Sequence, residues 1–338
     1  MPELSAIVAG ASGYTGALAA ALLHRHPAFE LVAVTSRSDA GRRLDDLYPE
    51  HRVPLVLDAF DPDEVGGVDA AIVAYPHGAA APVVAALREQ GTKVVDLSAD
   101  FRLHDPDAYS RWYGEHGAPH LLSEAVYGLT ELHRQAIAGA GLVANPGCYP
   151  TASLLALAPL AAEGLIEDVV IDAKSGVSGA GRAAAEEMAV VKETEDTKPY
   201  RVTGHRHTPE IAQELAELAG QNEALGSGVT FVPHLMPYDQ GELVSCYVRT
   251  TEPLDPARML AMYEQRYREE PFVEISSEPQ GVSGVRGTNL CRIHLALNEA
   301  SGRVLAFASI DNLWKGAASQ AIQNLNLMLG LPEGEGIS

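Results

Sequence analysis

Short apolar stretches alternate with longer helix-like segments over the N-terminal part of the chain. The apolar stretches have the composition of buried strands, and the segments between them have the composition of helices. The strand-like stretches are residues 5–9, 30–35, 69–75, 92–98 and 141–145, and the helix-like segments are residues 17–25 and the Ala-rich stretch that ends at Leu87. This alternation predicts a parallel sheet covered by helices, and therefore a doubly wound α/β domain.

The pattern changes after residue 147, where longer strand-like runs replace the alternation. The runs are VVIDAKS, VTFVPHLM, ELVSCYVRT and NLCRIHLAL. They predict an α+β domain with a mostly antiparallel sheet. One helix is expected between these runs, with Thr208 as its N-cap and Pro209 in its first turn, because Ile211, Leu215 and Leu218 recur at helical spacing.

A last helix is predicted near the C-terminus, because Ile322, Leu325 and Met328 are spaced by three residues. A chain of 338 residues has the length of two domains. We therefore expect a Rossmann-type domain in residues 1–147, joined by the helix within residues 311–338. Residues 148–310 are expected to form the second domain.

The charge and the cysteine content exclude several classes of protein. The chain has 24 Lys and Arg against 45 Asp and Glu, a net charge of -21 that opposes nucleic acid and anionic membrane surfaces. The sequence shows neither an apolar run long enough for a membrane span nor the basic start of a secretory signal, so a cytoplasmic location is expected. The three cysteines lack CxxC spacing, which argues against a disulfide framework and a structural zinc site.

The first strand leads into a Gly-x-x-Gly-x-x-Gly turn at residues 10–16. Glycines at this spacing let the backbone approach a pyrophosphate at a helix N-terminus. The second strand ends in Ser-Arg-Ser where an NAD-preferring site usually carries an acid, and these side chains suit a 2′-phosphate. We therefore expect NADP, the alternative being that Arg37 is an ordinary solvated residue. The expected cofactor contacts are Gly10, Ser12, Gly13, Tyr14, Thr15, Gly16, Ser36, Arg37 and Ser38.

Cys148 lies in the segment Asn-Pro-Gly-Cys-Tyr-Pro-Thr at residues 145–151. The strand ends at Asn145 and the Pro-Gly pair makes a sharp turn, so Cys148 is expected at a helix N-terminus. Such a position favours the thiolate, which is the form that attacks an acyl carbon, and its N–H groups stabilise an oxyanion. Cys246 and Cys291 lie in apolar strand-like runs and are expected to be inert.

Together with the segment Gly-His-Arg-His-Thr-Pro-Glu at residues 204–210, the cysteine segment resembles the N-acetyl-γ-glutamyl-phosphate reductase family of arginine biosynthesis. The resemblance extends over nearly the whole chain, through residues 10–16, 96–102, 175–182, 233–235, 287–289 and 311–317. It implies that NADPH reduces N-acetyl-γ-glutamyl phosphate to N-acetylglutamate semialdehyde through a thioester on Cys148, and that residues 148–310 form a catalytic and dimerisation domain. One position departs from the family, because Gln240 stands where an Arg that anchors the substrate is expected.

Two histidines in the second segment, His205 and His207, are candidates for proton transfer, because a catalytic base needs a pKa near the working pH. The resemblance favours His205 as the acid–base residue and His207 as a residue that contacts or orients the substrate. A metal bound by the pair is the alternative, but no matching Cys or His pair lies nearby, so no metal is expected.

Cations and glycine-rich turns offer places for an anionic substrate. Arg102 follows the carboxyl end of a predicted parallel strand, where ligands bind in open α/β sheets, and is a candidate for holding the leaving phosphate. The loop at residues 175–182 can form a backbone nest for an anion, with Arg182 at its exit. Lys174, Arg201 and Arg206 are weaker candidates. The expected substrate contacts are Ser98, Arg102, Asn145, Ser178, Arg182 and Glu210, and the resemblance adds Gly179 and Asn312 as contacts of the nicotinamide.

Two other functions stay open on the sequence. The first is a reductase of lysine biosynthesis that acts on a carrier-protein-bound glutamyl or aminoadipyl phosphate by the same chemistry, although an acidic carrier would need a basic rim. The second is a non-catalytic NADP-binding sensor that keeps the fold. We expect a small-molecule substrate, and a homodimer or homotetramer.

Overall fold

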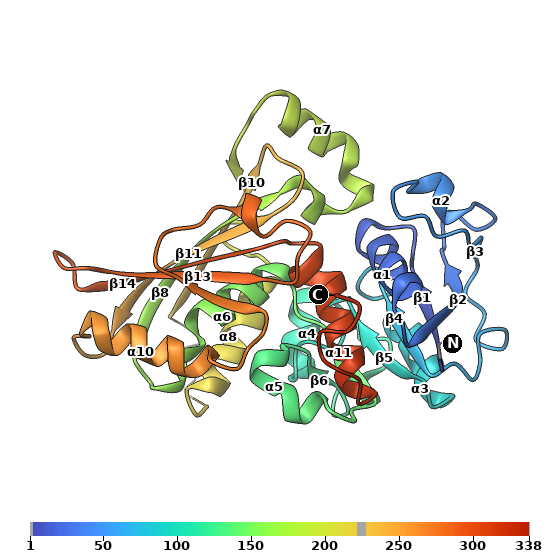
Figure 1. The fold of residues 1–338 in the computed structure, drawn as a ribbon, viewed down its shortest axis with the longest axis horizontal. Coiled ribbons are helices and arrows are strands. Elements are labelled where there is room, and N and C mark those ends of the chain that lie inside the picture. Colours follow the sequence, from blue (N-terminus) through green and yellow to red (C-terminus); the bar gives the residue numbers. More distant parts are fainter. Residues whose placement is uncertain (1–2, 222–227, 338) are drawn as a thin grey trace. The chain divides into compact units, whose positions relative to one another are not determined.

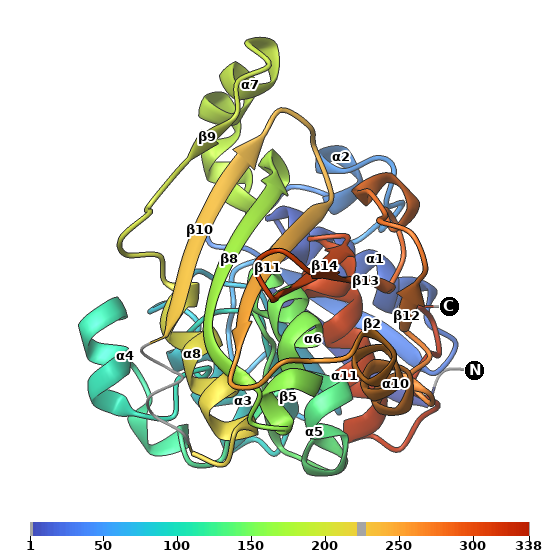
Figure 2. The ribbon, with the colours of Figure 1, turned by 90° about the vertical axis from the view of Figure 1, so that its left-hand side faces the viewer.

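The computed structural model describes residues 3–221 and 228–337. The chain divides into two compact units, each with its own sheet (Figures 1 and 2). Unit 1 consists of Met1–Gly147 and Ala317–Ser338, and unit 2 is Cys148–Gly316. Residues 311–316, which the sequence grouped with the last helix, belong to unit 2. Every helix of the described residues is too short or too polar to span a bilayer.

Unit 1 is built on a seven-stranded sheet in which neighbouring strands run parallel, as expected for a doubly wound fold. The strand order is β3-β2-β1-β4-β5-β7-β6, so the chain first builds outward from β1 on one side and then, from β4 onward, on the other. Ligands of open α/β sheets bind at the carboxyl ends of the strands where this reversal occurs. The strands are β1 (Leu4–Ala9), β2 (Phe29–Thr35), β3 (Leu57–Asp58), β4 (Ala70–Val73), β5 (Lys93–Asp96), β6 (Val126–Tyr127) and β7 (Leu142–Ala144).

The helices of unit 1 include the C-terminal helix α11 (Ser319–Met328). The predicted last helix is present, and its polar side chains are as buried as its apolar ones. Gln320 and Asn324 both donate to the carbonyl of Gly128, at 3.1 and 2.8 Å, and such hydrogen bonds satisfy their buried amides. The other helices are α1 (Tyr14–Arg25), α2 (Leu44–Leu47), α3 (Ala81–Glu89), α4 (Pro106–Tyr113), η1 (Pro119–Leu121) and α5 (Thr130–Ile137).

Unit 2 contains a second seven-stranded sheet of order β12-β13-β14-β11-β8-β10-β9. It is mostly antiparallel, as predicted, although β8 pairs with β10 and β12 pairs with β13 in parallel. The strands are β8 (Ile166–Gly176), β9 (Lys198–Pro199), β10 (Val229–Met236), β11 (Glu242–Thr250), β12 (Val273–Ser276), β13 (Cys291–Asn298) and β14 (Arg303–Ile310).

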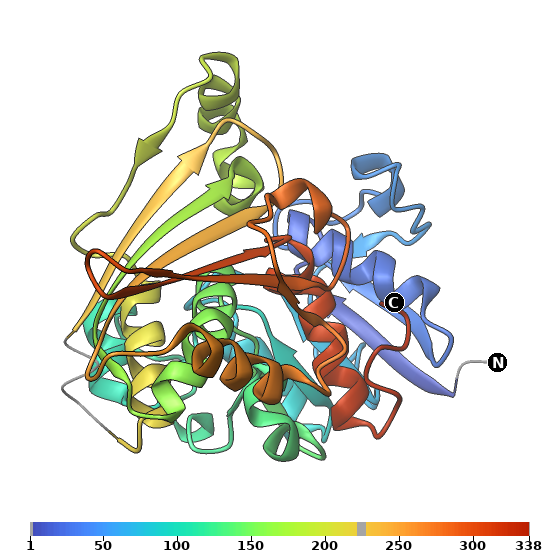
Figure 3. The same cartoon turned by 60° about the vertical axis from the view of Figure 1, so that its left-hand side comes forward.

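Helix α6 (Cys148–Ala162) is the central helix of unit 2, and its residues from Tyr149 to Ala161 are buried on every side. This accounts for its almost uniformly apolar sequence, because a helix without a solvent face needs no polar stripe. It lies on one side of the sheet with α8 (His207–Leu218) and α10 (Pro256–Tyr267) (Figures 1 and 3). The remaining elements are η2 (Val177–Ala180), η3 (Arg182–Ala184), α7 (Ala185–Glu193), η4 (Val282–Gly284) and the π-helix η5 (Trp314–Ala318). Helix α8 begins one residue before the predicted cap at Thr208.

A proline interrupts the hydrogen bonding of α6. Pro159 has no N–H, so the carbonyl of Leu155, four residues earlier, lacks its helical donor. The hydroxyl of Tyr267 on α10 donates to that carbonyl at 2.6 Å. A side chain of one helix thus supplies the hydrogen bond that the other cannot make.

Candidate active site

The glycine turn after β1 joins the first strand to α1 and is shaped by close backbone contacts. Gly10 has a positive φ of 95°, and a Cβ there would lie 2.8 Å from the carbonyl carbon of Ala74. A Cβ on Gly16 would collide with the carbonyl of Gly10. A Cβ on Gly13, in contrast, would enter open space beside the N-terminus of α1. The turn therefore leaves room for a ligand group at the end of a helix that favours an anion.

The residues after β2 form a hydroxyl-rich loop beside this turn. The hydroxyl of buried Ser36 lies 2.7 Å from that of Ser12 and accepts the backbone N–H groups of Ser38 and Asp39. Ser36 thus shapes the loop, while Arg37 and Ser38 are exposed. Tyr14 and Thr15, in the first turn of α1, are half-buried.

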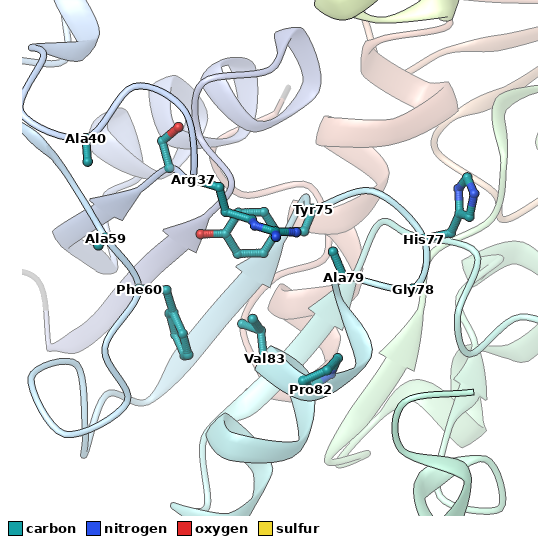
Figure 4. A pocket seen from close by; sticks show the side chains of 11 residues that line it. Arg37, Ala40, Ala59, Phe60, Tyr75, His77, Gly78, Ala79, Pro82 and Val83 are labelled. Atoms are coloured by element: carbon teal, nitrogen blue, oxygen red, sulfur yellow. The ribbon is translucent and has the colours of Figure 1, made fainter. Parts of the chain in front are cut away.

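A pocket of about 790 Å³ opens beside the same loop, and Arg37 lines it. Figure 4 shows Arg37 pointing toward the ring of Tyr75, with Phe60 and Val83 lining the pocket beside them. The Tyr75 hydroxyl lies 2.8 Å from the Thr35 hydroxyl, which fixes the ring at the end of β4. Tyr75 and Phe60 were not identified from the sequence, although Tyr75 closely follows the strand where the sheet order reverses.

In unit 2, Cys148 is the first residue of α6, as the sequence predicted, and its side chain is partly exposed. The π-helix η5 passes so close that a Cβ on Gly316 would lie 2.7 Å from the Cβ of Cys148. Cys246 and Cys291 are buried, and burial raises the pKa of the Cys246 thiol. Only Cys148 therefore combines a helix N-terminus with access to reactants.

Glu242, the first residue of β11, lies beside this thiol and was not identified from the sequence. Its side chain is fully buried, and burial raises its pKa to about 8. The nearby Cys148 thiol and Ser175 hydroxyl partly offset this rise in the pKa. Strand pairing produces this proximity, because Glu242 is the register partner of Ser175 on β8.

His205 and His207 lie with aromatic residues at the start of α8. The His205 ring contacts the rings of Tyr149, Tyr200 and His207, at centroid distances of 5.8, 5.5 and 4.8 Å. Burial lowers the pKa of His205 to about 3, and the nearby His207, Arg201 and Arg206 add to the effect. The structure therefore brings both histidines to Tyr149, the residue next to the thiol.

The residues expected to contact nicotinamide, Gly179 and Asn312, lie together in unit 2. The Asn312 amide donates to the Ser178 hydroxyl at 3.0 Å and accepts from the N–H of Gly241 at 2.7 Å. A Cβ on Gly179 would lie 3.1 Å from the Ser175 hydroxyl and 3.6 Å from the Asn312 amide nitrogen. Ser175 is also the register partner of Glu242, so this group lies near the buried acid.

The expected substrate contacts in unit 1 are largely engaged within the protein. The Arg102 guanidinium is buried and donates to the carbonyls of Asn145 and Leu97, at 2.7 and 2.9 Å. Asn145 is fully buried and accepts from Asn324 of α11 at 3.0 Å. Ser98 is buried and donates to Asp96 at 2.6 Å. These residues hold the end of β5 and the turn before Cys148.

In unit 2, Ser178 and Arg182 lie half-buried in the turns η2 and η3 that follow β8. Glu210 is buried in the first turn of α8. The structure thus places these three expected substrate contacts on two separate segments of the unit.

Gln240, where the sequence lacks the expected arginine, directs its side chain to a buried acid. Its amide donates to Asp311 at 2.6 Å, and Asp311 also accepts the N–H of Gly287 at 2.7 Å. The guanidinium of exposed Arg286 donates to the carbonyl of Gln240 at 2.6 Å. A cation therefore does lie at this loop, at position 286 instead of 240.

Comparison with known proteins places this geometry in a family. Residues 5–140 match the family described as semialdehyde dehydrogenase, NAD binding domain, and residues 148–312 match semialdehyde dehydrogenase, dimerisation domain. N-acetyl-γ-glutamyl-phosphate reductase of Dehalococcoides mccartyi is 46% identical over 340 residues, covering 100% of this chain and 98% of the relative. The protein of the same name from Moorella thermoacetica is 47% identical over 338 residues, covering 98% and 96%. The chain belongs to the N-acetyl-γ-glutamyl-phosphate reductase family.

Solved structures outside this reductase family share its fold. Aspartate semialdehyde dehydrogenase II of Vibrio cholerae, complexed with ASA, superposes with a TM-score of 0.75 at 18% identity, covering 98% of this chain and 99% of that one. Aspartate semialdehyde dehydrogenase of Candida albicans with NADP gives a TM-score of 0.69 at 16% identity, covering 97% and 98%. The two-unit fold predicted from the sequence is therefore that of the semialdehyde dehydrogenases.

Proposed function

We propose that this protein reduces N-acetyl-γ-glutamyl phosphate to N-acetylglutamate semialdehyde with NADPH, in arginine biosynthesis. The observation that carries the proposal is the partly exposed Cys148 thiol at the N-terminus of α6, in a chain whose full-length relatives bear the name of this reductase. An acyl phosphate is activated toward a thiol, and the resulting thioester is an acyl group that a hydride can reduce to an aldehyde.

The residues of unit 1 fit a dinucleotide with a 2′-phosphate. The open space at Gly13, beside the N-terminus of α1, accommodates the pyrophosphate, and the exposed guanidinium of Arg37 at the pocket suits the 2′-phosphate. Ser38, also exposed, offers a hydroxyl there, and the ring of Tyr75 lines the same pocket. When bound, NADPH supplies the hydride that reduces the thioester.

Cys148 performs the covalent step. Its sulfur attacks the acyl carbon, the C–S bond forms, and the bond between that carbon and the phosphate oxygen breaks. After reduction, the thiohemiacetal expels the thiolate and releases the aldehyde. The N-terminus of α6 favours negative charge at this position in both half-reactions.

His205 serves as a hydrogen-bond donor to the reacting oxygen, and this role follows from its surroundings. Its low pKa keeps the ring neutral near pH 7, and its Nδ1 accepts the backbone N–H of His207 at 3.1 Å. The single ring proton is therefore on Nε2, which can donate but not accept. His207 is proposed to contact or orient the substrate.

Substrate binding is proposed to involve Ser178, Arg182 and Glu210 of unit 2. Arg102 and Asn145 act indirectly, because their polar groups are engaged in holding the turn before Cys148. Ser98 supports the end of β5 in the same way. Arg286 is a candidate for the carboxylate-binding cation that position 240 lacks.

The proposed assembly is a homodimer or homotetramer formed through unit 2, which matches a family described as a dimerisation domain. A thiol nucleophile needs a reducing compartment, which supports the cytoplasm as the location.

A trapping experiment tests the function. Wild-type protein mixed with the acyl phosphate in the absence of NADPH should release one phosphate per active site and gain one N-acetylglutamyl group on the Cys148 peptide, measured by mass spectrometry. Cys148→Ser should lose the phosphate burst. The control variant Cys291→Ser, which changes a buried cysteine on a strand, should keep the burst. An unchanged burst in Cys148→Ser would discard the thioester, and turnover only on a carrier-bound acyl phosphate would reassign the substrate.

A further inference from the structure

Tyr75 is a buried tyrosine at the pocket of unit 1, and the proposed mechanism gives it no role beyond lining that pocket. It follows β4 by two residues, at the point where the strand order of the sheet reverses. Tyr75 is only 5% exposed, and a buried phenol needs a hydrogen-bond partner inside the protein. The groups around Tyr75 therefore show what the side chain does.

The hydroxyl of Tyr75 joins the ends of two strands that are not neighbours. It lies 2.8 Å from the hydroxyl of Thr35, the last residue of β2. In the sheet, β1 lies between β2 and β4. Neighbouring strands are spaced by about 4.8 Å, so β2 and β4 lie about 10 Å apart. A long side chain such as that of tyrosine is needed to make a hydrogen bond over this distance.

The backbone around Tyr75 is packed against the glycine turn of the proposed cofactor site. A Cβ on Gly10 would lie 3.0 Å from the backbone nitrogen of Tyr75. The carbonyl of Thr35 accepts the N–H groups of Gly10 and Ala11, at 3.0 and 2.9 Å. Thr35 thus binds Tyr75 through its side chain and the glycine turn through its carbonyl. These contacts fix the tyrosine in place beside the turn.

Arg37 lies two residues beyond Thr35 and shares the pocket with Tyr75. The backbone is held as far as Ser36, whose N–H donates to the carbonyl of Asp58 at 2.8 Å. The Arg37 side chain is exposed, and Figure 4 shows it directed toward the ring of Tyr75. The backbone position of Arg37 is therefore fixed by the loop, whereas the position of its guanidinium depends on what it lies against.

The ring of Tyr75 leaves the charge of Arg37 available to a ligand. Burial raises the pKa of Tyr75, and the hydrogen bond to Thr35 and the charge of Arg37 only partly oppose this rise, so the phenol is neutral. A neutral ring does not cancel the charge of a guanidinium, and arginine stacks on aromatic faces. A long side chain that is held in its binding position before the ligand arrives loses less conformational entropy on binding.

We propose that Tyr75 is a positioning residue that holds the Arg37 guanidinium where the 2′-phosphate of NADPH binds, an inference that rests on the proposed cofactor site. The hydrogen bond to Thr35 fixes the ring, and the ring supports the guanidinium. Tyr75 thereby contributes to the preference for NADPH over NADH through Arg37.

The test compares the binding of two nucleotides that differ only in the 2′-phosphate, adenosine 2′,5′-bisphosphate and 5′-AMP. Isothermal titration calorimetry on the full chain gives both dissociation constants, and their ratio measures the preference for the 2′-phosphate without acyl phosphate or turnover. Tyr75→Leu should reduce this preference by about three- to tenfold, because Arg37 loses its support. Arg37→Ala should reduce it by about tenfold or more, because the charged hydrogen bonds are lost.

A double-mutant cycle shows whether Tyr75 acts through Arg37. In an Arg37→Ala background, Tyr75→Leu should change the preference by less than about twofold, because the group that the ring supports is gone. The same loss in both backgrounds would overturn the inference. Equal weakening of the two nucleotides by Tyr75→Leu would also overturn it, because the ring would then act on the adenosine that they share.

More conservative variants keep the test valid if Tyr75→Leu does not fold. Tyr75→Phe and Thr35→Val remove the same hydrogen bond from its two sides, so they should reduce the preference by a similar factor of about two or more. Thr35→Ser keeps a hydroxyl and should keep the wild-type preference. The matched control Tyr127→Phe changes another buried tyrosine of unit 1, on β6, and should behave like the wild type. A wild-type preference in both Tyr75→Phe and Thr35→Val would contradict the role of this bond.

The wild-type result separates this inference from the proposed function. If the wild type binds the two nucleotides equally, the assignment of NADPH fails and the role of Tyr75 fails with it. If the wild type prefers the bisphosphate and folded Tyr75→Leu prefers it to the same extent, only the role of Tyr75 is lost. The thioester on Cys148 is tested independently by the trapping experiment.

Discussion

The backbone N–H of His207 donates to Nδ1 of His205 at 3.1 Å, and this bond fixes which nitrogen of His205 carries the proton. Burial lowers the pKa of His205 to about 3. We therefore expect that ionisation of this ring causes no change in kcat/KM between about pH 5.5 and 7.5. His205→Gln, whose amide can still donate, should retain at least about tenfold more activity than His205→Ala. Ring titration near pH 6.5 in the NMR spectrum would contradict the assignment.

The low pKa of His205 also affects stability. In the unfolded chain the ring titrates at the ordinary value of 6.5, whereas in the folded protein it stays neutral down to about pH 3. The unfolded state therefore binds more protons within this window, and stability should fall as the pH drops from about 6.5 toward 3. Urea unfolding midpoints of His205→Asn should decline less steeply over this range than those of the wild type.

Two glycines of the cofactor turn should respond differently to the same substitution. Gly10→Ala places a Cβ against the backbone of Ala74 at a positive φ, so it should destabilise the protein by about 2 kcal/mol or more. Gly13→Ala places its Cβ in open space, so the melting temperature should be nearly unchanged while NADPH affinity falls by about tenfold or more. Calorimetry and NADPH titration separate the two effects, and intact NADPH binding by Gly13→Ala would refute the pyrophosphate position.

Arg37 should decide between the two nicotinamide cofactors. Loss of its charged hydrogen bonds to a 2′-phosphate should raise KM for NADPH by about 10- to 100-fold in Arg37→Ala, with little change for NADH. Arg43→Ala removes a nearby exposed arginine that pairs with Asp45, and it should leave both values unchanged. Equal losses with the two cofactors would place the 2′-phosphate elsewhere.

The hydrogen bond between Tyr267 and the Leu155 carbonyl can be measured with a double-mutant cycle. Tyr267→Phe should lower the free energy of unfolding by about 1–3 kcal/mol, because the carbonyl loses the donor that replaces the N–H that Pro159 lacks. In a Pro159→Ala background, the new N–H of residue 159 can donate to Leu155, and the cost of Tyr267→Phe should shrink. Strictly additive free energies would show that the two groups act independently.

Local patterns in the sequence were sufficient for the fold and for the position of Cys148 at the start of a helix. The alternation of strands and helices predicted the doubly wound sheet, because the period of apolar residues reflects the element that buries them. The Pro-Gly pair before Cys148 predicted that a helix starts at that residue, because proline and glycine favour a turn whatever the rest of the fold is. The glycine turn was likewise evident, since its backbone geometry demands residues without a Cβ.

Only the tertiary structure decided what surrounds these residues. The pairing of β8 with β11 sets Glu242 opposite Ser175 and beside Cys148, a contact between positions far apart in the chain. The fold also buries the Arg102 guanidinium and directs it to the carbonyls of Asn145 and Leu97, which the sequence did not indicate. A sequence shows which groups can ionise or donate a hydrogen bond. The pKa of each group, and whether it can still bind a ligand, are set by its burial and its hydrogen-bond partners. Burial and partners depend on segments that only folding brings together.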